Sequence, residues 1–325
     1  MRVAFVVNDR REPSIEQTTT LLISAALRRG HEVSVCGVGD LTSSQDGALL
    51  ATACSLSGGD PATVVRQLLE NRTVRTALDE HDLCIIRTNP GRDESRRATQ
   101  IAALRLLERL EERGARVINS PRGLSRALTK LSLLDLPAKY TPRTLVTRDP
   151  SQIDRFVERE SDRAVIKPLD GTRGRDVFVL EAGGSRLNRK QIVDVVLRQG
   201  YAMVQEFVAG AERGDVRVTV VEGQILELDG DAAAIARIPH RDDFRSNLHA
   251  GGKAEAVAVS AKMREAVADI APYLLREGLI HVGVDFVGGQ ILELNVFSPG
   301  GLYPSERIYG HDFGSAVLAA FERLA

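Results

Sequence analysis

Near the C-terminus of this 325-residue chain, three oxygen-bearing side chains are spaced so that they could meet. Asp285 lies in one apolar stretch, and Glu293 and Asn295 lie in the next, after a Gly288-Gly289 pair that is typical of a hairpin turn. Glu293 and Asn295 are two residues apart and therefore project from the same face of a strand. Such oxygens suit a hard cation such as Mg²⁺, which keeps positions open for phosphate oxygens. The alternative is a solvated hairpin, because surface carboxylates are common.

An upstream segment carries residues that suit phosphate. Lys167 ends a predicted strand and leads into a loop that contains Gly171, Arg173 and Gly174. Glycines let the backbone approach phosphate oxygens, and successive N–H groups can form an anion nest. The loop lacks the G-x-x-x-x-G-K-[ST] pattern of a P-loop, and in isolation it is as typical of a plain hairpin turn. Lys130 is a second candidate in a chain that contains far more arginine than lysine.

Two further segments have features of a nucleotide and substrate site. The strand-like Gln205-Glu206-Phe207-Val208 could pair an adenine edge through its backbone while its acidic side chain meets a ribose, although such a string is more often an ordinary strand. Arginine side chains recognise carboxylate and phosphate through planar, paired hydrogen bonds. Surface solvation is the simplest role for any single one of these residues: Asp215, Arg217, Arg237, Arg245 and Asn247.

The first 120 residues have the pattern of an open α/β domain. A strand, a helix and a second strand follow one another, and this order implies a right-handed crossover and a parallel sheet. No G-x-G-x-x-G follows the first strand, which argues against a Rossmann dinucleotide fold. Residues 40–62, rich in Ser, Gly and Ala, are predicted to form a flexible loop. The predicted strands are 3–7, 31–36, 82–87 and 115–119, and the predicted helices are 18–29 and 96–113, the latter with Ile101, Leu104, Leu107 and Leu110 on its apolar stripe.

The pattern changes after Ser120-Pro121 to an α+β region. A helix containing Lys130 is expected first, and strands dominate from Met203 onward. We therefore predict an N-terminal domain at 1–120 and a second domain at 121–325, divided into parts at about 121–200 and 201–325. The predicted strands of the second domain are 144–147, 164–167, 203–207, 216–221, 224–228, 283–287 and 290–295, and its helices include 151–161 and 260–277.

Composition excludes several classes of protein. Lys and Arg number 43 against 44 Asp and Glu, so no basic excess indicates nucleic-acid binding. No apolar run approaches the length of a membrane span, and the N-terminus has no signal-peptide pattern. Cys36, Cys54 and Cys84 are widely spaced and are expected to be buried, reduced thiols. These observations predict a cytoplasmic protein with neither membrane nor nucleic-acid partners.

Taken together and in order, these motifs resemble the ATP-grasp superfamily and, within it, the bacterial glutathione synthetases. The resemblance covers nearly the whole chain, including Arg87-x-Asn89-Pro90 in the first domain. It implies a pre-ATP-grasp α/β domain followed by an α+β ATP-grasp domain. The strings that carry it are Val117-Ile118-Asn119, 144–147, 166–171, Ala236-Arg237-Ile238-Pro239, Asn247-Leu248, Ala250-Gly251-Gly252 and Val282-Gly283-Val284-Asp285.

The resemblance implies an ATP-dependent carboxylate–amine ligase that acts through an acyl phosphate and uses ATP and Mg²⁺, with Mn²⁺ as an alternative metal. Arg217 and Arg237 are candidates to stabilise the oxyanion, and residues 242–252 are expected to close over the intermediate. The implied nucleotide-binding residues are Lys130, Lys167, Gly171, Arg173, Gly174, Gln205, Glu206, Phe207, Val208 and Asp215, and the metal ligands are Asp285, Glu293 and Asn295. The implied substrate residues are Arg87, Arg245, Asn247, Gly251, Gly252, Ser298, Gly300 and Gly301.

Three departures of this sequence from the family pattern concern residues that would contact the ligands. The Gly171–Arg175 loop is bulkier and more basic than the glycine-rich loop of the family, and Asn89 stands where the family shows Asp. After Asn295, the family has a Thr-Ser-Pro-Thr stretch followed by Arg and Glu, whereas this chain has a different segment at 297–307.

The leading hypothesis joins γ-glutamylcysteine to glycine. One alternative is a related ligase for a different amino acid, peptide or natural-product precursor. Another is a non-catalytic nucleotide-binding regulatory protein of the same fold. The partners expected are small-molecule carboxylates and amines, with a homo-oligomer as an open alternative.

Overall fold

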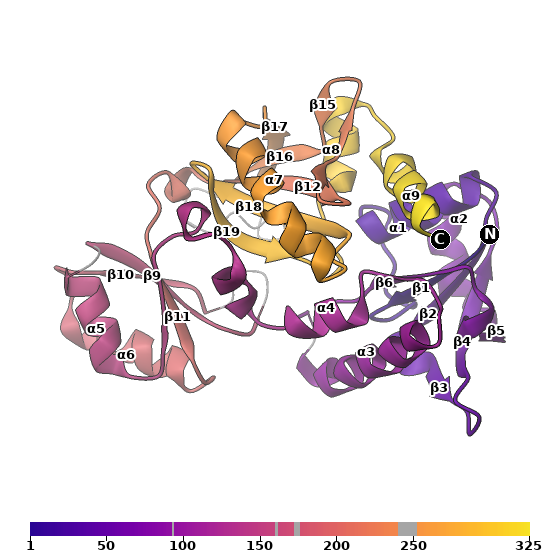
Figure 1. Cartoon of the computed structure of the whole chain (residues 1–325), viewed down its shortest axis with the longest axis horizontal. Helices are drawn as coiled ribbons and strands as arrows, with labels where there is room; N and C mark the ends of the chain where they lie inside the picture. The colour runs from indigo at the N-terminus through magenta and orange to yellow at the C-terminus, as the bar shows by residue number, and fades with distance from the viewer. Residues whose placement is uncertain (93, 160–161, 172–175, 240–251) are drawn as a thin grey trace.

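Three β-sheets organise the chain in the computed structural model, which describes residues 1–92, 94–159, 162–171, 176–239 and 252–325. The first sheet has seven strands, with β3-β4-β2-β1-β6-β7 in order and β5 paired to β4. The second has four strands in the order β10-β9-β11-β8, and the third has β17-β16-β12-β18-β19 with β13 paired to β12. Figure 1 shows the first sheet at the right, the second at the left and the third between them.

The centre of the first sheet is parallel, as the sequence predicts. The strands β1 (Arg2–Val7), β2 (Glu32–Gly37), β6 (Leu83–Arg87) and β7 (Val117–Ile118) pair in parallel. The helices α1 (Thr18–Arg28) and α3 (Arg97–Glu112) supply the crossovers. Leu104, Leu107 and Leu110 of α3 are buried, whereas Ile101 is exposed and lies outside the predicted apolar stripe. Carboxyl ends of these parallel strands therefore meet at one edge of the sheet.

The prediction of a flexible loop at residues 40–62 is wrong. Residues there form β3 (Leu41–Ser43) and β4 (Leu49–Leu56), and β4 pairs antiparallel with β2, β3 and β5 (Thr73–Ala77). The inward-facing residues of β4 include small ones, Ala51 and Ala53, which are fully buried. Small residues have weak strand propensity, so the alternation of buried and exposed residues along β4 is hard to recognise in the sequence. The helix α2 (Pro61–Glu70) follows, capped by Asp60.

The second sheet consists of β8 (Thr144–Thr147), β9 (Arg163–Pro168), β10 (Phe178–Glu181) and β11 (Ala202–Glu206). It packs against α5 (Pro150–Arg159) and α6 (Arg186–Leu197), with Ile153, Val157 and Val196 fully buried. The helix expected to contain Lys130 is a short 3₁₀ helix rather than an α-helix. A short α4 (Pro121–Arg126) ends before it, and Lys130 begins a 3₁₀ helix (Lys130–Asp135) that Thr129 caps.

The third sheet carries the predicted hairpins. Its strands are β12 (Asp215–Val221), β13 (Gln224–Ile225), β16 (Ala234–Ile238), β17 (Lys253–Ala256), β18 (His281–Val287) and β19 (Gln290–Asn295). Gly288 and Gly289 both have positive φ, as the hairpin turn between β18 and β19 requires. The strand expected at 224–228 is split, because β14 (Glu227–Leu228) leaves the sheet and pairs with β15 (Asp231–Ala232). The helix α7 (Ala261–Arg276) covers one face.

The C-terminal helices return to the N-terminal sheet. α8 (Leu302–Tyr309) follows the third sheet, and α9 (Phe313–Leu324) packs beside α1, where Figure 1 shows it in yellow. Phe313, Val317 and Phe321 are fully buried in the core that α9 shares with β1 and α1. This packing holds the third sheet against the first.

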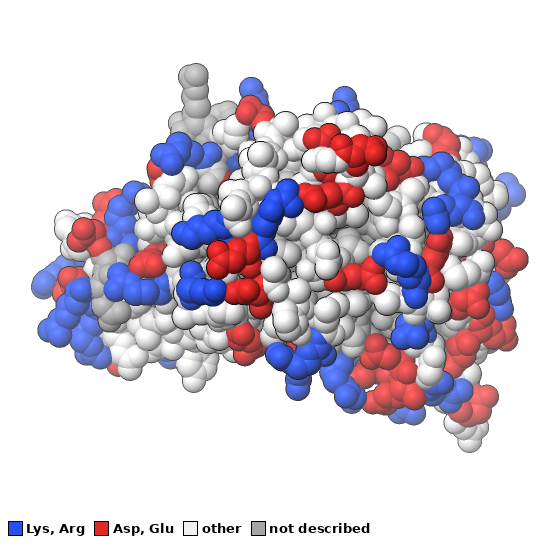
Figure 2. All heavy atoms as spheres, turned by 45° about the horizontal axis from the view of Figure 1, so that its top comes forward, with Lys and Arg blue, Asp and Glu red and all other residues white. Residues whose placement is uncertain are grey.

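Charges are mixed over the surface drawn in Figure 2, where acidic and basic side chains alternate without a continuous basic stripe. Among the described residues, no helix has the length and apolar character needed to span a membrane.

Candidate active site

A cavity of about 900 Å³ lies where the three sheets meet. The cavity is lined by the carboxyl ends of parallel strands in the first sheet and by residues of β9 and β11 in the second. Residues of β12, β16, β18 and β19 line it from the third sheet. Every predicted site residue that the structure describes lies on this lining. These residues are Arg87, Lys130, Lys167, Gly171, Gln205, Glu206, Phe207, Val208, Asp215, Arg217, Arg237, Gly252, Asp285, Glu293, Asn295, Ser298, Gly300 and Gly301. Arg173, Gly174, Arg245, Asn247 and Gly251 lie outside the described residues.

The β18–β19 hairpin brings the three predicted metal ligands together. Asp285 and Glu293 are directly opposite each other, and the Asn295 amide nitrogen donates to Asp285 Oδ2 at 3.0 Å. The register slips by one residue beside this pair, because Phe286 is opposite Ile291, so that Leu292 has no partner. Such a bulge bends a strand next to a site. Two carboxylates and an amide oxygen therefore face one cavity, a donor set that suits Mg²⁺.

Asp285 is held by two arginines. Arg217 lies opposite it on β12 and donates from Nε at 2.5 Å and from Nη2 at 2.7 Å. Arg237 Nη2 lies 2.7 Å from Asp285 Oδ2 and also forms a two-bond pair with Asp215, its cross-strand neighbour. The two guanidiniums and two carboxylates thus form one buried, alternating network. Arg217 and Arg237 are accordingly engaged with carboxylates in this structure, and they position Asp285.

Burial and charge act in opposite directions within this network. Burial opposes the ionisation of Asp285, but the charges of Arg217 and Arg237 outweigh it and hold the pKa of this carboxyl below its usual range. Burial and the nearby charge of Asp285 raise the pKa of Asp215 to about 6. Asp285 therefore stays ionised to lower pH than Asp215 does. Glu293 forms no ion pair or hydrogen bond with any described residue.

The two predicted lysines converge on the same hairpin from a different sheet. Lys167 ends β9 and is 8 % exposed, and its Nζ lies 3.5 Å from the carbonyl oxygen of Leu292, the unpaired bulge residue. Burial lowers the pKa of Lys167 to about 8, against the opposing attraction of Glu293. Lys130 Nζ donates to the carbonyl of Gly171 at 2.9 Å, and burial lowers its pKa as well. Neither ammonium has a carboxylate within 4 Å among the described residues, so both can receive an anion.

The segment 205–208 forms one wall of the cavity. Gln205 is buried and donates to Thr144, and Glu206 accepts from Arg143 Nε at 2.8 Å. The backbone amide of Phe207 donates to the carbonyl of Arg163 at 2.9 Å, and the guanidinium of that arginine stacks 3.9 Å from the Phe207 ring centroid. The strand thus ends in an aromatic ring beside an acidic side chain.

The loop after β19 connects the β18–β19 hairpin to the first sheet. Ser298 and Gly301 have positive φ, and a Cβ on Gly301 would lie 3.3 Å from Arg217 Cγ. Arg217 Nη1 is 3.4 Å from the Gly300 carbonyl, and Arg87 Nη2 donates to the Pro299 carbonyl at 2.9 Å. Two buried arginines, one from each domain, therefore fix adjacent carbonyls of this loop.

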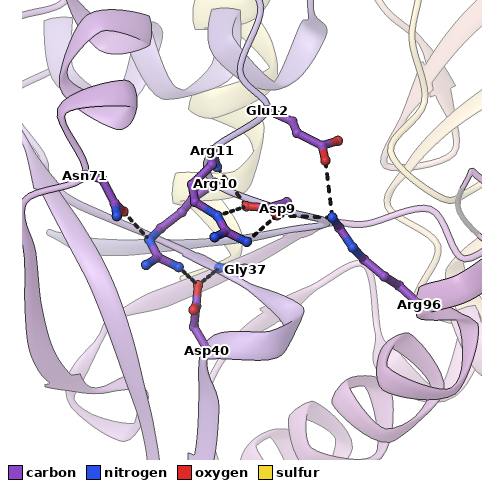
Figure 3. A network of polar contacts seen from close by, with 8 residues as sticks. All are labelled: Asp9, Arg10, Arg11, Glu12, Gly37, Asp40, Asn71 and Arg96. Atoms are coloured by element: carbon purple, nitrogen blue, oxygen red, sulfur yellow. Dashed lines mark hydrogen bonds and ion pairs between the residues drawn. The ribbon is translucent and has the colours of Figure 1, made fainter.

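Sequence reasoning missed the loop after β1. Asp9, Arg10 and Glu12 line the cavity, and Figure 3 shows them within a polar network. Arg96 lies 3.2 Å from Asp9 and 3.3 Å from Glu12, while Arg10 pairs with Asp40. The place of this loop directly after the first predicted strand could have identified it, because ligands of open α/β sheets bind at the carboxyl ends of central strands.

Comparison with known proteins identifies the family. Residues 1–125 match the profile of the prokaryotic glutathione synthetase N-terminal domain, and residues 129–310 match that of the prokaryotic glutathione synthetase ATP-grasp domain. The chain belongs to the prokaryotic glutathione synthetase family. The glutathione synthetase of Synechococcus elongatus is 30% identical over 100% of this chain and 99% of its own length. That of Vibrio cholerae is 33% identical over 92% of this chain and 89% of its own length.

Solved structures agree on the fold. D-cycloserine synthetase DcsG superposes with a TM-score of 0.69 at 18% identity and covers 99% of this chain and 100% of its own. The ATP-grasp ligase PsnB, complexed with minimal precursor, Mg and ADP, has a TM-score of 0.62 at 22% identity, over 99% of this chain and 97% of its own. The predicted ATP-grasp architecture is therefore confirmed. As a member of the glutathione synthetase family, the chain is an ATP-dependent carbon–nitrogen ligase with a fold that binds ATP.

Proposed function

We propose that this ligase joins γ-glutamylcysteine to glycine at the expense of ATP. The glutathione synthetase name of its full-length relatives supports these substrates. The observation that carries the proposal is that two lysines, neither with a carboxylate partner among the described residues, line the same cavity as the hairpin that bears Asp285, Glu293 and Asn295. The lysines can bind the phosphates while the carboxylates of the hairpin can bind a cation, and transfer of a phosphoryl group to a carboxylate requires both kinds of group.

In this proposal, Lys130 and Lys167 bind the nucleotide phosphates, and residues 205–208 receive the adenosine. The backbone amide of Val208 donates no hydrogen bond to any described residue, which leaves it available to an adenine nitrogen. Glu206 and Asp215 also line the cavity, and their carboxylates suit the ribose hydroxyls. Gly171, with φ near 102°, begins the loop that contains the proposed phosphate contacts Arg173 and Gly174.

Asp285, Glu293 and Asn295 would hold Mg²⁺. The fit rests on their oxygen donors and on Glu293, whose carboxylate no described residue engages. A Mg²⁺ ion bound there would neutralise phosphate charge. Mn²⁺ prefers similar oxygen ligands and is the alternative. Arg217 keeps Asp285 ionised and oriented, and Arg237 does so from the other side.

The reaction proceeds in two steps. An oxygen of the substrate carboxylate attacks the γ-phosphorus, and the bond from that phosphorus to the β,γ-bridging oxygen breaks, which releases ADP. The amine then attacks the acyl carbon, and phosphate leaves with the former carboxylate oxygen. Arg217 and Arg237 are proposed to stabilise the oxyanion. The residues Arg87, Arg245, Asn247, Gly251, Gly252, Ser298, Gly300 and Gly301 are proposed to bind the substrates, and the segment 242–252 is proposed to close over them.

A different substrate pair is the second candidate, and a specific observation favours it. The segment 297–307 departs from the family's Thr-Ser-Pro-Thr stretch with its following Arg and Glu, and Tyr303 and Pro304 of this segment line the cavity. A different amino acid, a peptide or a natural-product precursor would then replace one substrate.

We further propose that residues 1–120 act as the substrate-side domain and 121–325 as the ATP-grasp domain. The three cysteines are buried and free, which fits a reducing compartment such as the cytoplasm. Small-molecule substrates are the proposed partners, and self-association into a homo-oligomer is open to measurement.

Coupled ADP release tests the proposal directly. The chain is assayed with ATP, Mg²⁺ and a panel of carboxylates and amines. ADP formed only with γ-glutamylcysteine and glycine is the expected result, and ADP formed with another pair would favour the second candidate. No ADP with any pair would contradict both and would favour a nucleotide-binding protein without turnover.

A further inference from the structure

One ion pair joins the domain of the first sheet to the second sheet. Arg97, the first residue of α3, has its Nη2 3.1 Å from Oδ2 of Asp170, which lies in the segment after β9. Among the residues that the structure describes, no other ion pair connects residues 1–120 to residues 144–206. Residues of both parts line the large cavity, so the pair connects two parts of the chain that each contribute to the active site.

Both members of this pair lie beside a loop of the active site. The connection between β6 and α3 ends at Arg97, and its residue Asn89 lines the large cavity. Asp170 precedes Gly171, which lines the same cavity and has a φ of 102°. A second, smaller cavity of about 70 Å³ is lined by both loops, and Arg97, Gly171 and Glu293 all border it. The ion pair therefore connects a loop of the first domain to the start of the proposed phosphate loop.

Two cations hold the segment 169–171. Lys130 Nζ donates to the carbonyls of Gly171 at 2.9 Å and of Asp170 at 3.3 Å. Arg97 binds the side chain of Asp170, whose second oxygen, Oδ1, is buried without a hydrogen-bond partner among the described residues. Lys130 is proposed to bind phosphate, and its ammonium would then leave these carbonyls. Arg97 would remain as the cation that holds the segment.

Transfer of a phosphoryl group depends on how well its two reactants are placed. The reacting atoms must approach to about 3–3.5 Å, and a small misplacement reduces the rate strongly. In the proposed function, the second sheet contributes Lys167 and the segment 169–171 to the phosphates, whereas residues 1–120 form the substrate side. A direct contact between these two parts therefore fixes the phosphates relative to the substrate carboxylate.

We propose that Arg97, acting through Asp170, positions the phosphate-binding segment 169–171 against the first domain. This inference rests on the proposed function. Arg97 is a positioning residue, because its guanidinium binds the Asp170 carboxylate and acts on the nucleotide only through it. The two side chains are 30 % and 45 % exposed, so solvent screens the pair, and its loss corresponds to roughly 2- to 5-fold in a rate or binding constant. Added salt should reduce this effect further.

The test follows the dependence of ADP release on ATP concentration. The value of kcat/KM for ATP is measured with saturating γ-glutamylcysteine and glycine, at low salt and in about 0.5 M NaCl. The enzymes are the wild type, Arg97→Gln, Arg97→Lys, Asp170→Asn and the double variant that combines Arg97→Gln with Asp170→Asn. The matched control is Arg109→Gln, which removes an exposed arginine of the same helix that lines neither cavity.

At low salt, Arg97→Gln and Asp170→Asn should each lower kcat/KM for ATP roughly 2- to 5-fold, and the double variant should lose no more than either single one. Arg97→Lys should recover most of the loss, because a single N–O contact forms the pair, and Arg109→Gln should match the wild type. Direct attraction between Arg97 and the phosphates predicts the opposite sign for Asp170→Asn, since this variant removes a negative charge. A rise in Asp170→Asn, additive losses in the double variant, losses that persist at high salt, or unchanged single variants would overturn the proposal.

Calorimetric titration of the same variants with Mg²⁺ and a non-hydrolysable ATP analogue requires no turnover. If no substrate pair yields ADP, the proposed function fails, yet weaker nucleotide binding by both Arg97→Gln and Asp170→Asn, with the double variant no weaker, would still support the positioning role. Equal nucleotide affinity in the wild type and both single variants would overturn that role even if the wild type turns over normally.

Discussion

Asp285 and Glu293 face each other on one hairpin, yet replacing each should have different consequences. Asp285 is 2 % exposed and receives bonds from Arg217, Arg237 and Asn295. The variant Asp285→Asn leaves Arg217 without a carboxylate partner, and breaking a buried pair from one side costs about 3–5 kcal/mol. Glu293 has no such partner among the described residues, so Glu293→Gln should change the free energy of unfolding by less than about 1 kcal/mol.

Urea unfolding and ADP release together test this difference. Asp285→Asn should lower the unfolding midpoint by roughly 1 M, for an m value near 3 kcal/mol/M. Both variants should lose at least about 100-fold in turnover, because each removes a proposed metal ligand. Adding Arg217→Met to Asp285→Asn should recover part of the lost stability, since no buried charge is then left unpaired. Equal loss of stability in both single variants, or wild-type turnover in Glu293→Gln, would refute the reasoning.

Three other predictions follow from the same geometry. The pKa of Lys167 is lowered to about 8, and phosphate stabilises the charged form, so nucleotide affinity measured by calorimetry should fall by up to about 10-fold per pH unit above pH 8. This slope should be absent in Lys167→Met, and an affinity independent of pH between 8 and 9 in the wild type would contradict the phosphate role. Gly301→Ala should lower thermal stability, because residue 301 has a φ of 121° and a Cβ there would lie 3.3 Å from Arg217 Cγ. Gly300→Ala has open space around it and should leave the melting temperature near that of the wild type, so equal losses would contradict this account of the loop. Phe321→Ala in α9 should lower the free energy of unfolding, measured with a chemical denaturant, by about 3–5 kcal/mol, because this side chain is fully buried between the C-terminal helix and the first sheet. A loss below about 1 kcal/mol would contradict this packing.

Much of the site could be anticipated because its chemistry lies in short local patterns. The hairpin at 285–295 follows from its glycine pair and its strand period, and this period places Glu293 and Asn295 on one face. The parallel strands β1, β2 and β6 follow from apolar runs that alternate with a helix. Cross-strand relations lie beyond such reasoning. Nothing local predicts that Arg217 faces Asp285 or that Arg237 faces Asp215, because both pairings depend on strand register.

The errors also have physical causes. Burial of Ala51 and Ala53 makes β4 a strand although small residues have little intrinsic preference for one. Lys130 lies in a 3₁₀ helix because tertiary contacts with the loop at 169–171 override the helical pattern around it.

Transfer of an oxygen isotope tests the central claim most directly. The substrate carboxylate is labelled with ¹⁸O, and the inorganic phosphate released in the presence of ATP, Mg²⁺ and the amine is analysed by mass spectrometry. Attack of the carboxylate on the γ-phosphorus predicts one ¹⁸O atom in each phosphate, in amounts that match the ADP and the amide product. Unlabelled phosphate accompanying amide formation would contradict an acyl phosphate route and, with it, the role that the structure suggests for this cavity.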